Sequence, residues 1–508
     1  RHGHGDHGQV GQVGIAAQSA QTEREIRLEV DMEEDERQAE RENDAAERNV
    51  RPPRRGRHGA RTGLGQRSDG HGRPLYWPRS MRLPLLWRRS ATAAGTYLSV
   101  LFGFLGTLVV ARVLGPHDFG LFALVVATAS FFQILLDLTA EEALVKYGYH
   151  YVTAEHWGRL RRLFSQALKI KVLGGLLAAI AIAIAAPFAD SIFGTKGLEQ
   201  PMLVAALLPL LQSPEGVASA ALIVRGRYDL RGAYLALAMA LRLTGLAIGS
   251  HYGLTGAIAG MVVAQAFATA ALGLAGLLAF RHFPQAPSTA LGADRRGILH
   301  FVFQSSLATG ILAGRGALTP LLLGTVATPV QVGYFRVAQA PQAGFTALTS
   351  PVRLILLTEQ TAAWEAGAVD TVFEGIRRYT VGAAVLMAAI VPPVFVFMPD
   401  LIRIFYGHAY IGAANAARLM LLSAALLVIS GWSKSFPVSI GRPGLRILAH
   451  GVETAVLIPL VVVLGSHWEA AGAAGAVLAS SAIFVAIWGL LVLRIRRAHP
   501  KELSEATV

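Results

Sequence analysis

Twelve apolar stretches, each long enough to cross a lipid bilayer, occupy most of the chain between residues 91 and 493. A membrane-spanning helix needs about 20 mostly apolar residues, because the hydrocarbon core is about 30 Å thick. The predicted spans are 91–114, 119–145, 169–189, 201–223, 232–251, 253–280, 298–322, 333–356, 379–399, 413–433, 447–465 and 471–493. Lipid offers the backbone no hydrogen-bond partner, so only helices or closed barrels span it. We therefore predict an all-α membrane protein with about 12 transmembrane helices.

The composition supports a membrane protein and shows no enzyme motif. Of the 508 residues, 53% are hydrophobic and only 16% are charged, which is too little charge to cover a soluble protein of this length. The chain has no cysteine, so disulfides and thiolate metal sites are excluded. No phosphate-binding loop, nucleophile elbow or His/Glu metal motif occurs, and the connections between spans are short. We expect a transporter without a cofactor, and not an enzyme.

Residues 1–80 differ in character from the rest of the chain. They carry 14 basic and 14 acidic residues, many glycines and few apolar residues, so we expect disorder. Met81 stands just before the first span. Residues 1–80 are therefore either a native N-terminal extension or upstream sequence outside the mature protein. Residues 498–508 are expected to form a cytoplasmic tail.

The net charge of +13 comes from outside this extension and follows membrane topology. Basic residues fill every second connection and the C-terminal end: Lys146, Arg159, Arg161 and Arg162; Arg225, Arg227 and Arg231; Arg281, Arg295 and Arg296; Arg377 and Arg378; Arg442 and Arg446; and Arg494, Arg496, Arg497 and Lys501. Cytoplasmic loops of membrane proteins carry an excess of Lys and Arg. We therefore predict a multi-pass protein of the bacterial inner membrane, with both termini cytoplasmic and no nucleic-acid partner.

Three short segments recur at nearly equal spacing, which indicates an internal duplication. The pairs are Arg227-Tyr-Asp-Leu-Arg231 with Arg442-Pro-Gly-Leu-Arg446 (215 positions apart), Gly253-Leu-Thr-Gly256 with Gly472-Ala-Ala-Gly475 (219) and Gly120-Leu-Phe with Gly333-Tyr-Phe (213). Each pair falls at the same helix boundary of its half. We predict two six-helix lobes, residues 81–290 and 291–497, related by an axis along the membrane normal. This arrangement lets one lobe rock against the other.

Five arginines are candidate substrate ligands, because a charge at membrane depth is costly and usually functional. Arg315 lies past the middle of the seventh span, between Gly314 and Gly316. The other four are Arg242 in the fifth span, Arg336 at the start of the eighth, and Arg88 and Arg89 at the mouth of the first. The guanidinium group donates two hydrogen bonds at once and stays charged when partly desolvated. We therefore expect an anionic head group, such as a pyrophosphate between lipid and sugar.

Some of these residues have a second interpretation. An ion pair with Glu215 in the fourth span explains Arg242 equally well, and Arg88 and Arg89 are also explained as topology anchors. Acidic residues are fewer in the spans, and a buried carboxylate can bind Na⁺ or a proton. Asp137 and Glu215 are therefore our candidates for coupling transport to an ion gradient.

One motif connects the first two spans. The segment Ala111-Arg112-Val113-Leu114-Gly115-Pro116-His117-Asp118-Phe119-Gly120-Leu121-Phe122 resembles the A-R-x-L-G-P-x-x-[FY]-G-x-[FY] motif of polysaccharide-biosynthesis flippases. These are the Wzx-type branch of the multidrug/oligosaccharidyl-lipid/polysaccharide exporter superfamily, and the resemblance extends over about 85–500. It implies two lobes around a central cavity, and alternating access that flips an undecaprenyl-pyrophosphate-linked oligosaccharide outward for O-antigen or exopolysaccharide. The family tends to place a basic residue in the seventh span, where Arg315 lies.

Three alternatives to this function remain open. A multidrug or small-cation exporter of the same superfamily favours acidic groups in its cavity, whereas the deepest charge here is an arginine. A membrane glycan polymerase or ligase usually needs a long periplasmic loop, and none is present. A scaffold that assembles glycan enzymes without transport is the third. The expected partners are the lipid-linked oligosaccharide, membrane lipids and other glycan-assembly membrane proteins.

Overall fold

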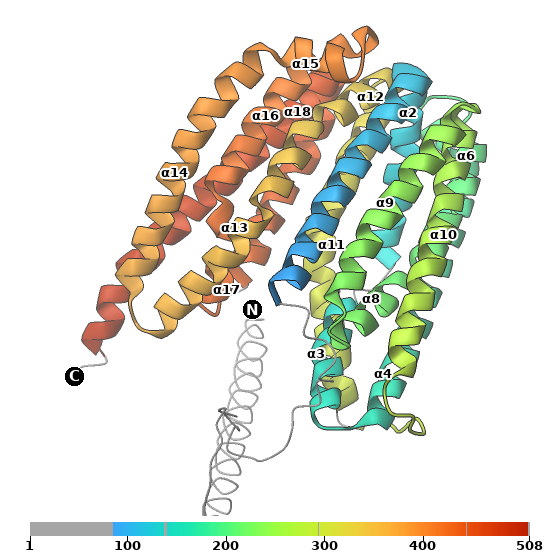
Figure 1. The fold of residues 1–508 in the computed structure, drawn as a ribbon. Helices are drawn as coiled ribbons and strands as arrows, with labels where there is room; N and C mark the ends of the chain where they lie inside the picture. The colour runs from blue at the N-terminus through green and yellow to red at the C-terminus, as the bar shows by residue number, and fades with distance from the viewer. Residues whose placement is uncertain (1–84, 137–139, 293, 443, 506–508) are drawn as a thin grey trace, which may run out of the picture. The chain divides into compact units, whose positions relative to one another are not determined.

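The computed structural model describes residues 85–136, 140–292, 294–442 and 444–505, which are almost entirely helical and contain no strand (Figure 1). The helices of the first half are α2 (Leu85–Leu136), α3 (Glu141–Thr153), α4 (Trp157–Ala185), η1 (Ala186–Phe188), α5 (Ala189–Ile192), α6 (Glu199–Ala205), α7 (Leu207–Gln212), α8 (Glu215–Val224), α9 (Tyr228–Ser250) and α10 (Gly253–Arg281). Those of the second half are α11 (Asp294–Val326), α12 (Pro329–Ala338), α13 (Ala340–Glu365), α14 (Val369–Val396), α15 (Met398–Phe405), η2 (His408–Ala413), α16 (Ala414–Ile429), η3 (Gly431–Lys434), α17 (Phe436–Ser439) and α18 (Gly444–Glu505). We call α2–α10 the first lobe and α11–α18 the second lobe. The expected disorder of residues 1–80 and the candidate Asp137 lie outside the described residues.

Two of the helices each contain two membrane crossings. The backbone of α2 leaves the helical region at Gly115 (φ 75°, ψ 172°), and that of α18 does so at Glu469 (φ 51°, ψ −128°). Both helices run up and back down the bundle in Figure 1. Within the described residues, eight helical segments have the length and apolar composition needed to cross a membrane, and these two double-length helices are among them. With α11 and the α12–α13 pair, they account for the predicted twelve crossings.

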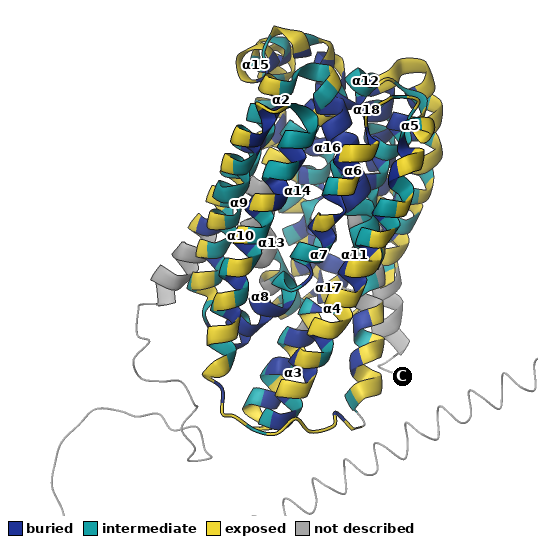
Figure 2. Cartoon of the chain, turned by 90° about the vertical axis from the view of Figure 1, so that its right-hand side faces the viewer, coloured by how far each residue is buried: buried dark blue, intermediate teal, exposed yellow. Residues whose placement is uncertain are grey.

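The outward faces of the helices are apolar, as contact with lipid requires. On α4, the side chains of Leu173, Leu177, Ile180 and Ile184 are exposed, whereas the small Ala178 on the opposite face is buried. Exposed residues follow the outer faces of the helices in Figure 2. In a soluble protein such a helix would bury its large apolar face, but in lipid small residues let helices approach closely. The pattern therefore confirms a membrane-spanning bundle.

The predicted repeat is visible in two matching helix ends. Gly226 and Gly441, 215 positions apart, both have positive φ (76° and 69°). At each position the glycine N–H binds the carbonyl three residues back, and the next N–H, of Arg227 or Arg442, binds the carbonyl five residues back. This is the Schellman arrangement, which favours glycine because other residues are strained at positive φ. The two halves thus end corresponding helices in the same way.

The lobes cross at the end of the bundle opposite the arginine-rich connections, and the crossing is also repeated. A Cβ atom added to Gly120 of α2 would lie 1.8 Å from the carbonyl oxygen of Pro329, and one added to Gly333 of α12 would lie 2.5 Å from that of Pro116. Gly333 lies 213 positions after Gly120, and Pro329 lies 213 positions after Pro116, so each lobe presents the same surface to the other. A large buried cluster surrounds this crossing and includes Phe119 from the first lobe.

A second contact joins the lobes at the arginine-rich end. The hydroxyl of Tyr151 in α3 donates to Oδ2 of Asp294 in α11 at 2.8 Å, and Nη1 of Arg159 lies 3.4 Å from the same oxygen. Burial, followed by the bond to Asp294, raises the pKa of the Tyr151 hydroxyl, which therefore stays a donor. The first turn of α11 is thus anchored to the first lobe.

Candidate functional site

A cavity of about 620 Å³ lies between the two lobes. Its walls come from both arms of α2, from α9, from α12 and the start of α13, and from Tyr406. Most of the lining is apolar, including the aromatic side chains of Phe102, Phe104 and Phe122. Two arginines, Arg242 and Arg336, supply its only charges among the described lining residues.

Arg336 is positioned by a short helix with defined ends. Thr328 has an extended backbone and precedes Pro329, which suits the first turn of a helix. Pro341 has no N–H to continue the hydrogen-bond ladder, so the chain bends where α12 gives way to α13. The exposed side chain of Arg336 donates from Nη1 to Oε1 of Gln339 at 2.8 Å, and both residues line the cavity.

Arg242 reaches the same cavity from α9 in the other lobe. This helix packs closely on α2, since a Cβ atom on Gly95 would lie 2.1 Å from the carbonyl oxygen of Gly232. Arg242 is eight residues from the end of α9 and Arg336 seven from the start of α12, so both lie about 10–12 Å below the lobe crossing. Both line the same cavity, so their like charges repel each other. Among the described residues, no carboxylate pairs with either arginine.

Arg315 has a different environment from the one expected. It forms an ion pair with Glu453 of α18, whose side chain is 0% exposed, and Glu453 Oε2 lies 3.0 Å from Nδ1 of His450. Arg315 is not among the described residues that line the cavity. A buried carboxylate requires a compensating charge, so a structural role within the second lobe explains Arg315. The geometry does not favour the predicted contact with substrate.

Glu215 likewise does not pair with Arg242. Its Oε1 accepts hydrogen bonds from the Tyr234 hydroxyl (2.5 Å), Nε2 of Gln265 (2.6 Å) and the Thr269 hydroxyl (2.8 Å). These residues lie on α8, α9 and α10, so the network is internal to the first lobe. The alternative ion pair is therefore wrong, and a coupling role for Glu215 stays a prediction. Arg88 and Arg89 lie in the first turn of α2, but their side chains are outside the described part of the structure.

The sequence motif lies at the lobe crossing and not in the arginine cavity. Arg112 donates from Nε to the carbonyl of Phe405 at 2.7 Å and from Nη2 to that of Ile404, at the end of α15. The Tyr410 hydroxyl donates in the other direction, to the Ala111 carbonyl at 2.6 Å. A cation next to unpaired carbonyls at a helix end is stabilising. The motif therefore ties the two lobes together.

Two residues near the arginines were missed by the sequence prediction. Tyr406 lines the cavity beside Arg336, and His450 contacts Glu453, the partner of Arg315. Both depend on contacts between helices that are distant in the sequence. Gln339, which also lines the cavity, follows Arg336 by three residues, and this spacing places both on one helix face.

Solved structures with the same fold belong to one superfamily of transporters. An inward-facing multidrug resistance MATE family transporter of the MOP superfamily aligns with a TM-score of 0.63 and 16% identity, covering 80% of this chain and 96% of that chain. The lipid II flippase MurJ, in an inward closed conformation, aligns with a TM-score of 0.60 and 12% identity, covering 79% and 87%. A MOP superfamily transporter from Pyrococcus furiosus, described as having a binding pocket of reverse polarity, aligns with a TM-score of 0.52 and 15% identity, covering 81% and 95%. These similarities confirm the predicted fold.

The sequence comparisons identify the family. No curated protein matched the sequence. The family model for polysaccharide biosynthesis protein matches residues 109–415, which is more than half of the chain and includes the motif from Ala111 to Phe122. The resemblance found in the motif is therefore confirmed, and the chain belongs to the polysaccharide biosynthesis protein family, with a fold shared by MATE transporters and a lipid flippase.

Proposed function

We propose that this protein flips an undecaprenyl-pyrophosphate-linked oligosaccharide from the cytoplasmic to the periplasmic leaflet by alternating access, for O-antigen or exopolysaccharide biosynthesis. The observation that carries the proposal is the pair of arginines in the cavity between the lobes. Arg242 comes from the first lobe and Arg336 from the second, and neither has a carboxylate partner among the described residues. Two uncompensated guanidinium groups at membrane depth favour an anionic ligand.

The cavity suits a molecule with a phosphate and a hydrocarbon chain. A pyrophosphate offers oxygens to both arginines, and each charge-assisted hydrogen bond contributes about 1.5–3 kcal/mol. The aromatic walls near Phe102 and Phe104 suit the chain next to the phosphate. The family match supports the glycan, because its members are polysaccharide biosynthesis proteins. The undecaprenyl carrier comes from the family resemblance.

The proposed setting follows the same argument. The protein works in the bacterial inner membrane with both termini in the cytoplasm, as the distribution of arginines predicts. An H⁺ or Na⁺ gradient drives the cycle, and Glu215 is the described candidate for coupling. Glycan-assembly membrane proteins supply and receive the lipid-linked oligosaccharide. The activity is transport, and no bond in the substrate is broken.

An exporter of cationic drugs is the second candidate, because MATE transporters share the fold. A cationic substrate would meet repulsion from Arg242 and Arg336 in a cavity with no described acidic lining residue. The charge of the cavity therefore favours the flippase.

Complementation of a flippase-deficient strain tests the proposal. Wild-type protein is expected to restore surface polysaccharide, and Arg242→Met or Arg336→Met to reduce it at equal membrane expression. Loss of one charge-assisted bond weakens phosphate binding roughly 10- to 100-fold. Arg403→Met removes an exposed arginine outside the cavity and is the matched control. Full activity of both cavity variants, or dye export without glycan transport, would contradict the proposal.

A further inference from the structure

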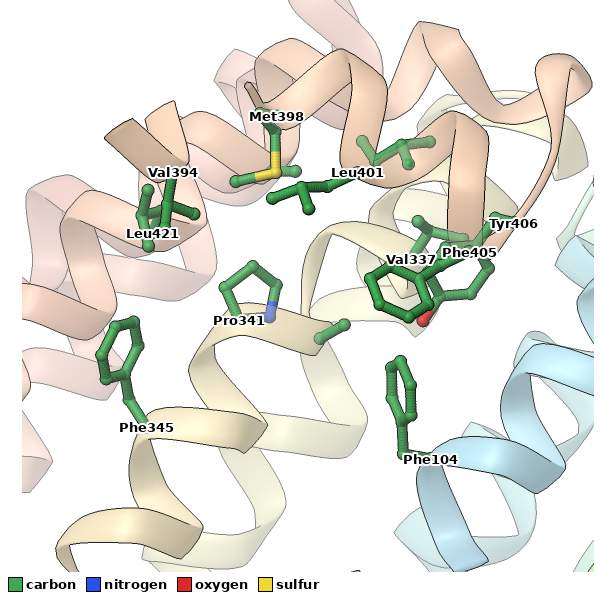
Figure 3. Close-up of a pocket in the computed structure, with 13 residues that line it drawn as sticks. Phe104, Val337, Pro341, Phe345, Val394, Met398, Leu401, Phe405, Tyr406 and Leu421 are labelled. Atoms are coloured by element: carbon green, nitrogen blue, oxygen red, sulfur yellow. The ribbon is translucent and has the colours of Figure 1, made fainter. Parts of the chain in front are cut away.

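An apolar pocket of about 240 Å³ lies beneath α15 (Figure 3). Met398 and Leu401 of α15 lie above it, and Pro341 and Phe345 of α13 lie below. Phe104 of α2 borders it on the side of the first lobe. Among the described lining residues, all side chains are hydrocarbon or thioether except that of Tyr406, which carries a hydroxyl. Such a lining offers nothing to a sugar or a phosphate.

The pocket adjoins the arginine cavity. Phe104, Ala340 and Tyr406 line both of them. Val337, which lines the pocket, follows Arg336 directly in α12. A ligand held by Arg336 can therefore extend an apolar segment into the pocket without crossing a polar region.

The pocket also lies close to the arginines along the bundle. It is under α15, which lies at the end of the bundle opposite the arginine-rich connections (Figure 1). Arg242 and Arg336 lie about 10–12 Å below the lobe crossing at that same end. A chain that leaves a phosphate held there and runs toward α15 therefore reaches the pocket with its first isoprene units. An apolar cavity of about 150 Å³ holds a benzene molecule, so about 240 Å³ holds roughly two isoprene units.

We propose that the pocket beneath α15 binds the isoprene units next to the phosphate of a polyprenyl phosphate held by Arg242 and Arg336. This inference rests on the proposed function and adds a site for the carrier lipid. The occupant is the substrate's own chain and not a bilayer lipid, because three residues line both the pocket and the cavity that holds the phosphate site.

Binding of two soluble probes in lipid nanodiscs tests the proposal. Geranyl pyrophosphate carries two isoprene units, and inorganic pyrophosphate carries none. Val394→Phe places a larger side chain in the pocket, and Val302→Phe makes the same change in a separate pocket between α4 and α11. Leu401→Trp fills the pocket from α15 and is the second variant if Val394→Phe does not fold.

The expected result distinguishes binding of the isoprene chain from binding of the phosphate. Val394→Phe should lower the affinity for geranyl pyrophosphate about tenfold, which is the equivalent of two excluded methylene groups. The affinity for inorganic pyrophosphate should not change. Val302→Phe should change the affinity for neither probe. If Arg242→Met weakens both probes while the filled pocket changes neither, the chain lies elsewhere and only this inference fails. If wild-type protein binds neither probe, the proposed function fails with it. Loss of a co-purified phospholipid from Val394→Phe, with unchanged geranyl pyrophosphate binding, would assign the pocket to bilayer lipid and overturn the inference.

Discussion

Substitution of Gly120 tests whether the lobe crossing is a contact that opens during transport. A Cβ atom at Gly120 would lie 1.8 Å from the carbonyl oxygen of Pro329, whereas ordinary contacts begin at 3.4 Å. The difference means that Gly120→Ala must separate α2 from α12 by about 1.6 Å. For Gly333→Ala the distance to the Pro116 oxygen is 2.5 Å, so the separation is only about 0.9 Å. Such overpacking costs about 1–3 kcal/mol and so shifts the equilibrium toward an open crossing by about 5- to 150-fold.

Cysteine labelling measures this shift directly, because the chain has no native cysteine. Val332 is 0% exposed beside the crossing, so Val332→Cys should react slowly with a charged maleimide. Gly120→Ala should raise the labelling rate in proportion to the open population, and Gly333→Ala should raise it less. Gly273→Ala is the matched control, since nothing described lies within 4 Å of its added Cβ atom. Equal labelling in folded Gly120→Ala and Gly273→Ala proteins would refute the reasoning.

Three further predictions concern side chains near the cavity. Arg315→Met and Glu453→Gln should each cost about 3–5 kcal/mol of stability, because one buried charge loses its partner. In thermal unfolding, the double variant should lose less stability than the sum of the two single losses. Additive losses would argue against the ion pair. Arg112→Met removes both donors to the end of α15; amide exchange of residues 398–405 should accelerate, and unchanged protection would show that the capping is unimportant. Glu215→Met removes the one oxygen that accepts from Tyr234, Gln265 and Thr269; stability should fall by about 1–3 kcal/mol, and an unchanged melting temperature would contradict this.

The architecture could be predicted because it depends on local sequence. Membrane helices follow from apolar length and topology from charged connections, and neither requires knowledge of helix neighbours. The Schellman ends at Gly226 and Gly441 are equally local, which explains why the repeat was detectable there. Gly256 and Gly260 have the Gly-x-x-x-Gly spacing that is typical of close helix packing, and both glycines contact α9 closely. Gly310 and Gly314 of α11 have the same spacing, but Cβ atoms added there would meet no described atom within 4 Å.

The site was harder to predict, because its chemistry depends on which helices face one another. Arg315 is the more deeply placed arginine by sequence, but Glu453 pairs with it from 138 positions away. Arg336 was expected at the start of the eighth span, close to the membrane surface, and was one of the five candidate ligands. In the structure α12 is a short helix that begins at the lobe crossing, so the same residue reaches the cavity. Depth within a span therefore predicts the cost of a charge, and only its partners decide whether that charge is available to a ligand.

The arginine pair has a physical consequence for a two-lobed transporter. The duplication did not produce it, because the position that corresponds to Arg336 in the first lobe is Ala123, 213 positions earlier. One guanidinium group comes from each lobe, so without a ligand the two charges repel each other across the lobe interface. An anion between them replaces that repulsion by attraction to both lobes. Since a ligand shifts an equilibrium only through its different affinity for the two states, a site divided between the lobes makes the binding of a phosphate depend on their separation. The same substrate held by one lobe alone would move with that lobe and could not bias the rocking.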